Sequence, residues 1–147
     1  MKINFIFKSL IVKSGFKKVL FRKKVRHIAA RIVSGENTNF GNINLVFCDD
    51  KFIRDYNNKY LGHDYETDIL TFPDINDEGK TEGEMLISVE TVNSNSMKFK
   101  TNYDEEICRV IIHGFLHLCG YKDKTTSEKI KMRKKENFYI KQSEDAR

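Results

Sequence analysis

The sequence predicts an α+β fold in which a small mixed sheet of about four strands packs with about five helices. Apolar residues alternate with polar ones near the amino terminus, and several later segments repeat them at helical spacing. Strands and helices do not alternate regularly enough for a doubly wound sheet. One proline, no low-complexity tract and no internal repeat give no sign of a boundary, so we expect one domain over residues 1–147.

Short apolar runs and apolar helical stripes place the individual elements. The predicted strands cover residues 3–7, 44–48, 69–72 and 85–89. The predicted helices cover residues 21–35, 51–60, 91–97, 104–118 and a final charged segment from about 125. The acidic stretch 74–83 shows neither pattern, and it is predicted to be a loop or a wide hairpin.

Capping residues support several of the predicted helix ends. Side chains suited to cap a first turn precede three helices: Asp49 and Asp50, Asn102 or Asp104, and Thr125 with Glu128 at capping-box spacing. Gly35 and Gly62 stand where two of the helices are expected to end.

Composition excludes a membrane-spanning protein, because no segment approaches the ~18 uninterrupted apolar residues that a span requires. The segment from Met1 to Lys18 is interrupted by lysines and lacks a small-residue cleavage site, so it is interpreted as folded structure and not as a signal peptide. The cysteines are odd in number and widely spaced, which favours free thiols and a cytoplasmic location: Cys48, Cys108 and Cys119.

The net charge of +5 is distributed unevenly along the chain. Residues 1–35 contribute +10, residues 36–121 contribute −9 and residues 122–147 contribute +4. Two basic ends around an acidic middle favour a polyanionic partner, because clustered Lys and Arg release the counterions of a phosphate backbone. Solvated helix faces would give the same totals, so the charge alone leaves both interpretations open.

The segment 113–123 carries the strongest chemical signal. His113 and His117 are four residues apart, so on a helix their imidazoles share one face and can converge on one metal ion. Gly120 can adopt a positive φ and end the helix, which would bring Asp123 back toward the same ion. Three such ligands leave a tetrahedral zinc ion one open position for water, as in catalytic sites. Two histidines that only form hydrogen bonds in a core helix are the alternative.

The predicted helix 104–118 is apolar around most of its circumference. At about 100° per residue, its polar side chains fall in one sector of roughly 80°. These side chains are Glu106, Arg109, His113 and His117. A polar sector on a buried helix needs a partner, which a divalent metal and its surrounding polar groups would supply. Arg109 is therefore a candidate for transition-state stabilisation and Glu106 for orienting the metal ligands, while a surface ion pair and a helix-start preference are the alternatives.

The histidine spacing also suggests a zinc protease, but the sequence lacks that enzyme's base. Gly114 follows the first histidine, where H-E-x-x-H has the catalytic glutamate. Peptide hydrolysis by that mechanism is disfavoured, and the basic flanks make a phosphodiester the expected target. Asp68, at the start of a predicted strand, is expected to cap or orient.

Three motifs in register resemble the YbeY family of bacterial metal-dependent endoribonucleases. The first is H-G-F-L-H-L-C-G-Y, followed by Glu128, Met132 and Glu136 at a spacing of four. The segment 67–73 resembles the family's T-D-V-L-S-F-P strand, and the segment 83–88 resembles its G-D-I-V-I-S strand. Order and spacing agree over most of the chain, whereas the basic first 35 residues fit only loosely.

The resemblance implies a zinc-hydrolase-like α+β fold with one zinc ion and hydrolysis of single-stranded RNA. It also implies a role in 16S ribosomal RNA 3′-end maturation and in 70S ribosome quality control, with ribosomal RNA and the ribosome as partners. A ribosome-associated RNA-binding factor whose metal is only structural is the alternative. The oligomeric state is not readable from the sequence.

The sequence departs from the family pattern at two places. The resemblance maps the metal onto His113, His117 and position 123, where Asp123 replaces the usual histidine. Aspartate is a competent zinc ligand, although its charge makes a bound water less acidic. Leu61 stands where the family commonly has an arginine that is thought to meet substrate, and His63 could partly substitute for it as a hydrogen-bond donor.

Overall fold

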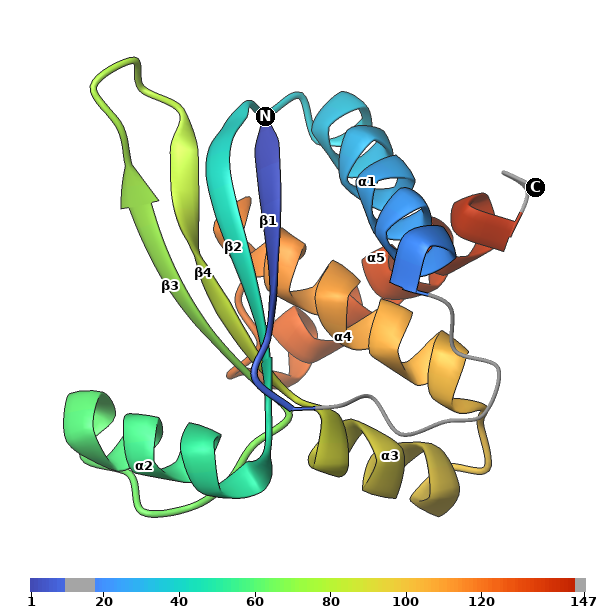
Figure 1. The fold of residues 1–147 in the computed structure, drawn as a ribbon. Coiled ribbons are helices and arrows are strands. Elements are labelled where there is room, and N and C mark those ends of the chain that lie inside the picture. The colour runs from blue at the N-terminus through green and yellow to red at the C-terminus, as the bar shows by residue number, and fades with distance from the viewer. Residues whose placement is uncertain (10–17, 145–147) are drawn as a thin grey trace.

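A computed structural model describes residues 1–9 and 18–144 (Figure 1). Within this part of the chain, four strands form one sheet in the order β1-β2-β4-β3. Their bounds are β1 (Lys2–Phe7), β2 (Phe40–Cys48), β3 (Ile69–Ile75) and β4 (Thr81–Ser88). β2 runs parallel to both β1 and β4, and β3 is antiparallel to β4. The sheet is therefore mixed, as the sequence predicts.

Five helices complete the described structure and confirm the α+β class. Their bounds are α1 (Lys18–Gly35), α2 (Asp50–Leu61), α3 (Val89–Lys98), α4 (Tyr103–Leu118) and α5 (Thr126–Glu144). None of the helices in the described ranges is long and apolar enough to cross a membrane. The amino-terminal segment from Met1 to Lys18 is interpreted as folded structure. Its first part forms β1, and residues 10–17 of the segment lie outside the described residues.

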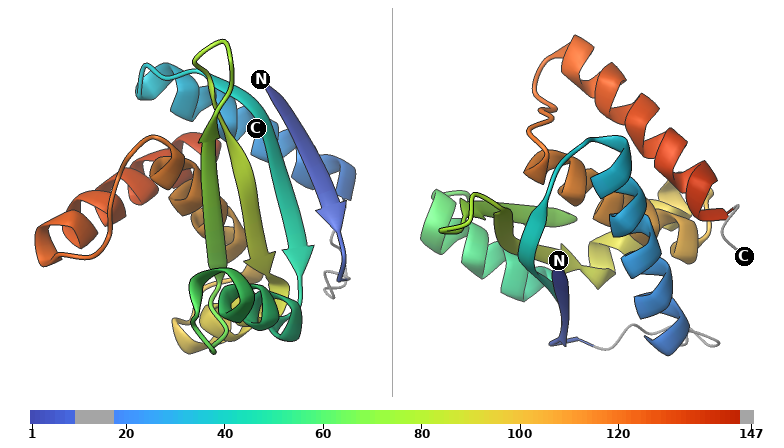
Figure 2. Two further views of the ribbon diagram at one scale, coloured as in Figure 1. Left: turned by 90° about the vertical axis from the view of Figure 1, so that its left-hand side faces the viewer. Right: turned by 90° about the horizontal axis from the view of Figure 1, so that it is seen from above.

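Side chains that alternate along the strands divide the core between the two faces of the sheet. Leu45, Phe47 and Ile87 belong to a large apolar cluster with α1, α4 and α5. Val46 and Leu86 point the other way and meet α2, which lies on the opposite side of the sheet (Figure 2). α4 lies in the middle of the helical layer and contacts the sheet, α1, α3 and α5.

Of the two alternatives predicted for 74–83, the loop is wrong for most of that stretch, and the structure shows the hairpin. β3 continues to Ile75 and β4 begins at Thr81, so only residues 76–80 form the turn of a hairpin. The Asn76 side chain closes this turn by accepting hydrogen bonds from two backbone N–H groups. None of the residues at these strand ends is buried, and Ile75 is their only large apolar residue, so the apolar alternation on which the prediction relied is absent there.

Most of the predicted helix caps are present. Asp49 accepts a hydrogen bond from the Phe52 backbone N–H at 2.8 Å, and Asn102 accepts one from that of Glu105 at 2.7 Å. Thr125 and Glu128 form the reciprocal capping box at the start of α5. These caps fix where α4 and α5 begin, and these two helices carry the residues of the candidate site.

Candidate metal centre

The position of α4 against the sheet depends on a glycine. A Cβ on Gly114 would clash with the Met85 sulfur and lie 2.7 Å from Cδ1 of Ile69, so a larger residue here would force these side chains of β4 and β3 to shift. Position 114 therefore faces the sheet and not the metal-binding side of the helix. This is why no base of the H-E-x-x-H type can act from this position.

A tight bend after α4 returns the chain toward the two histidines. Gly120 has φ of +101°, a conformation that side-chain-bearing residues rarely adopt. The backbone N–H of Tyr121 donates to the carbonyl of Leu116 at 3.0 Å, which closes the bend. Asp123 then reaches back to the histidines, as the sequence predicts.

His113, His117 and Asp123 form a group that could hold a metal ion. Their ligand atoms are mutually close: the two Nε2 atoms are 2.9 Å apart, and the Asp123 Oδ2 atom lies 3.1 Å from Nε2 of His113 and 3.3 Å from that of His117. Atoms that are each about 2.0–2.1 Å from a tetrahedral zinc ion lie roughly 3.3 Å from one another. The arrangement fits such an ion with little adjustment.

Hydrogen bonds on the far side of each imidazole assign the donor atoms of the group. His117 Nδ1 lies 2.9 Å from the Tyr121 carbonyl oxygen, which can only accept, so this nitrogen carries the proton. His113 Nδ1 lies 2.7 Å from a Glu136 carboxylate oxygen and donates to it. In the neutral rings, both Nε2 lone pairs then point at the Asp123 carboxylate. Three electron-rich atoms in contact need a cation between them, and a divalent metal provides the charge.

Glu136 on α5 is the residue that orients His113. It is buried, and it also accepts a hydrogen bond from Arg109 at 3.2 Å. Burial alone would raise the pKa of the Glu136 carboxyl, but the bonds from His113 and Arg109 hold it below its ordinary value. Burial alone would lower the pKa of His113, but the hydrogen bond to Glu136 raises it overall. Sequence analysis noted the spacing of Glu136 in a motif but did not assign this contact.

A second carboxylate, Glu36, stabilises the bend that carries Asp123. It follows the end of α1 and accepts hydrogen bonds from the Tyr121 hydroxyl, from the Tyr139 hydroxyl at 2.5 Å and from the Lys135 ammonium at 3.1 Å. Although partial burial raises the pKa of Glu36, these bonds lower it overall. Glu36 therefore connects α1, the bend and α5, and nothing in the sequence pattern indicated this.

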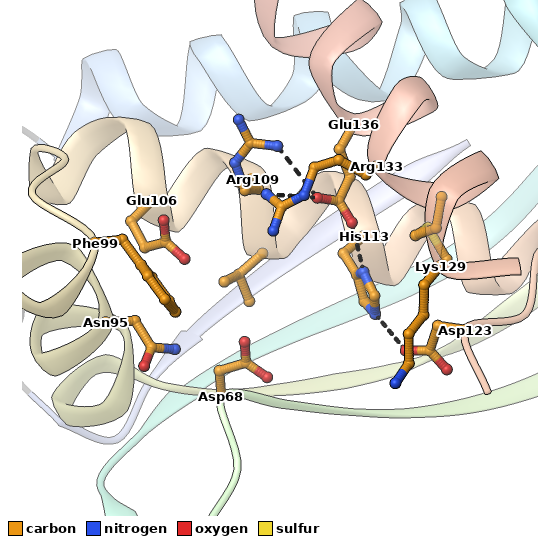
Figure 3. Close-up of a pocket in the computed structure, with 12 residues that line it drawn as sticks. Asp68, Asn95, Phe99, Glu106, Arg109, His113, Asp123, Lys129, Arg133 and Glu136 are labelled. Carbon is orange, nitrogen blue, oxygen red and sulfur yellow. Dashed lines mark hydrogen bonds and ion pairs between the residues drawn. The ribbon is translucent and has the colours of Figure 1, made fainter. Parts of the chain in front are cut away.

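One pocket of about 310 Å³ extends from the metal-binding group along α4 (Figure 3). The predicted site residues Glu106, Arg109, His113 and Asp123 all line it. Its other lining residues include Asp68 at the start of β3, Asn95 and Phe99 near the end of α3, and Lys129 and Arg133 on α5. Three of the four polar side chains in this sector of α4, all but His117, thus face a cavity, as their functional interpretation requires.

The two candidate catalytic residues have different surroundings in this pocket. The Arg109 guanidinium is held by Glu136 and by the Asn137 side chain at 2.9 Å. Glu106 is 7% exposed, and burial raises its pKa. It forms no hydrogen bond with His113, whose orienting partner is Glu136. The exposed cations Lys129 and Arg133, which sequence analysis did not single out, also line the pocket (Figure 3).

Asp68 lines the pocket, whereas Leu61 and the segment that follows it lie outside the pocket. Burial raises the pKa of the Asp68 carboxyl, and the nearby His113 opposes this shift. The Asp68 carbonyl accepts the backbone N–H of Ser88 at 2.9 Å at the start of β3, and its capping or orienting role stays a prediction. Leu61 ends α2 and is exposed, and His63 stacks on Tyr65. Neither Leu61 nor His63 lines the pocket.

Fold and site together define an α+β protein with a histidine, histidine and aspartate group able to hold a metal ion at the edge of a pocket. The family model described as "Endoribonuclease YbeY" matches residues 11–144. The chain belongs to this family.

Curated relatives support the same assignment. A protein of Karelsulcia muelleri named "Endoribonuclease YbeY" is 45% identical over 109 residues, which cover 74% of this chain and 77% of the relative. One of Chloroherpeton thalassium with the same name is 36% identical over 132 residues, covering 90% and 93% of the two chains. The solution structure of TM1509 from Thermotoga maritima is similar in fold, with a TM-score of 0.66 and 24% sequence identity over 96% of this chain and 88% of that one.

Proposed function

We propose that the protein is a zinc-dependent endoribonuclease that hydrolyses phosphodiester bonds of single-stranded RNA. The observation that carries this proposal is the convergence of His113, His117 and Asp123 on one point at the edge of a pocket. Membership of the endoribonuclease family supports the choice of substrate. We further propose that the chain is a single domain and works in the cytoplasm. There it would process the 3′ end of 16S ribosomal RNA and take part in 70S ribosome quality control.

The exposure of the metal-binding group favours a catalytic role over a purely structural one. The side chains of His113, His117 and Asp123 are 22%, 25% and 40% exposed, so substrate can reach the ion that they would hold. Three protein ligands also leave a position open, whereas structural zinc sites are normally closed by four. When bound, zinc would polarise a phosphoryl oxygen and supply a nucleophile at neutral pH.

Basic side chains next to this group are suited to hold the phosphate backbone. Lys129 and Arg133 are exposed on α5 and line the pocket. Arg109, held in place by Glu136, is proposed to stabilise the charge that develops on the reacting phosphate. Further Lys and Arg residues on α1 can contact more distant phosphates, which would make affinity fall with salt.

The test replaces one ligand and one matched histidine outside the site. His117→Ala is expected to lose bound zinc, measured by elemental analysis, and to lose cleavage of single-stranded RNA while staying folded. His27→Ala, on the surface of α1, is expected to keep both properties. Undiminished cleavage in zinc-free His117→Ala would exclude the proposal. Unfolding of His117→Ala together with an inactive, zinc-loaded wild type would favour the structural-metal alternative.

The ribosomal part of the proposal needs a separate experiment. The zinc-loaded protein is expected to shorten the 3′ end of a 16S ribosomal RNA precursor in isolated small subunits, and the His117→Ala variant is not. Cleavage of unstructured RNA alone, with the precursor left intact, would limit the function to a nuclease without this target.

A further inference from the structure

The end of the pocket away from the metal-binding group contains side chains that make no hydrogen bond with that group. Asn95 and Phe99, near the end of α3, line it together with Glu106 on α4 (Figure 3). Glu106 precedes His113 by seven residues, a helical rise of about 10 Å. A group bound here would lie beside the reacting phosphate and not on it.

Phe99 presents an aromatic ring to solvent at the wall of this cavity. The residue is 58% exposed, although a ring of this size gains free energy when it is covered. The ammonium of Lys98 lies 5.5 Å from the ring centroid, so a positive charge stands next to the aromatic surface. An exposed ring beside a cation is the combination with which proteins bind the bases and phosphates of single-stranded nucleic acids.

Glu106 is a buried polar group without a hydrogen-bond partner. It is 7% exposed, and its carboxyl accepts no hydrogen bond from any residue in the described ranges. Its carboxyl oxygens are not among the fully enclosed atoms that lack a partner, and the residue lines the pocket, so these oxygens can accept a hydrogen bond from a donor on a bound ligand. The Asn95 side chain also makes no hydrogen bond within the described part of the chain. The Glu106 carboxyl and the Asn95 side-chain carbonyl can therefore accept hydrogen bonds from a ligand that covers the Phe99 ring.

We propose that Phe99, Asn95 and Glu106 form a subsite that binds one nucleobase next to the cleaved phosphate and favours a base with an exocyclic amino group. The base stacks on Phe99, and its amino group donates to the Glu106 carboxyl. Adenine, cytosine and guanine carry such a group, whereas at the position of the cytosine amino group uracil has a carbonyl oxygen, which the carboxyl oxygens repel. This subsite rests on the proposed function, because it supplies the sequence preference of an RNA-cleaving enzyme.

The decisive comparison uses two pyrimidines, because they have similar size but opposite hydrogen-bonding groups. Binding of labelled oligocytidine and oligouridine to the zinc-loaded protein is measured by fluorescence anisotropy, and the bases flanking cleavage sites are mapped on an RNA of random sequence. Oligocytidine is expected to bind at least about fivefold more tightly than oligouridine. The cleavage map is expected to show depletion of uridine at one fixed position beside the cut.

Two variants separate the roles of stacking and hydrogen bonding. Phe99→Leu is expected to weaken both oligonucleotides by about fivefold or more, while Phe138→Leu, an exposed ring on α5 outside the pocket, leaves both unchanged. Glu106→Gln replaces a pure acceptor by a group that also donates, so it is expected to reduce the preference for cytidine and to keep the bound zinc.

The possible results distinguish this proposal from the proposed function. Equal binding of the two oligonucleotides by the wild type, or equal effects of Phe99→Leu and Phe138→Leu, would overturn the subsite even if RNA is cleaved. Selective binding by a zinc-loaded wild type that leaves RNA intact would overturn the nuclease and keep the subsite. A fixed base preference that disappears in Glu106→Gln would support both.

Discussion

The two ends of the pocket differ in how well their polar groups are satisfied. At the metal-binding end, each histidine has a defined partner for its second nitrogen, and Glu136 is itself held by Arg109. At the other end, Glu106 and Asn95 have no hydrogen-bond partner for their side chains among the described residues, and Phe99 is open to solvent.

The difference indicates a division of work within one cavity. Groups that must hold a metal ion are oriented in advance, because misplaced ligands lose affinity. Groups that receive a ligand from solution keep their hydrogen-bonding capacity until it arrives. Substitutions at the metal-binding end are therefore expected to change zinc affinity. Substitutions at the other end of the pocket are expected to change RNA affinity and base preference.

The largest effect is expected from Glu136, whose loss would abolish the order at the metal-binding end. Glu136→Ala removes the acceptor for His113 Nδ1 and leaves Arg109 without its buried partner, so zinc affinity is expected to fall about 10–100-fold. Competition with a chelator measures this. Glu128→Ala, which removes only a helix cap on α5, is the control and should keep zinc affinity. Equal affinities in the two variants would contradict the orienting role.

A smaller effect is expected from Glu36, which acts on the bend and not on a ligand. Glu36→Gln keeps one acceptor but loses the charge that faces Lys135 and the hydroxyls of Tyr121 and Tyr139. The free energy of unfolding is expected to fall by about 1–3 kcal/mol. Denaturant titration measures this, and oligocytidine selectivity should be unchanged. A loss of that selectivity would contradict the claim that the two ends of the pocket act independently.

The same variant gives a pH dependence with a defined sign. The pKa of Glu36 is lower in the folded protein than its unfolded value of about 4.3, so its stabilising contribution is complete above that pH and is lost as the pH falls through the folded pKa. The difference in melting temperature between wild type and Glu36→Gln should therefore be constant near neutrality and shrink below about pH 4. A difference that grows on acidification would contradict the assignment.

The smallest effect is expected from Arg133, an exposed cation that lines the pocket. Arg133→Gln should raise KM for RNA a few-fold at low salt, leave zinc binding intact and reduce the salt dependence of affinity. Steady-state kinetics at several salt concentrations measure this. Lys134→Gln, also exposed on α5 but outside the pocket, serves as the control. Identical kinetics for the two variants would place the RNA backbone elsewhere.

Sequence reasoning located the metal-binding group because its geometry is local. Two histidines four residues apart share a helix face whatever the helix packs against, and Gly120 permits the bend that returns Asp123. The mixed sheet was also predictable in outline. Over 74–83 the sequence left a loop and a wide hairpin open, because strands that are not buried need no apolar alternation.

The partners of these residues were not predictable, because they come from elements far apart in the chain. Glu136 meets His113 only after α5 packs on α4, and Glu36 meets Tyr121 across 85 positions. Phe99 and Glu106 face the same cavity through the packing of α3 on α4. Neither composition nor spacing encodes such contacts. The residues that orient the site and those that would select its substrate therefore emerge only from the structure.

The convergence of His113, His117 and Asp123 on one zinc ion can be measured by a zinc-edge X-ray absorption spectrum of the loaded protein in solution, recorded for wild type and Asp123→Ala. We expect two imidazole nitrogens and at least one carboxylate oxygen at about 2.0–2.2 Å in the wild type, and loss of the carboxylate contribution in the variant. A sulfur ligand, or identical spectra from the two proteins, would contradict it.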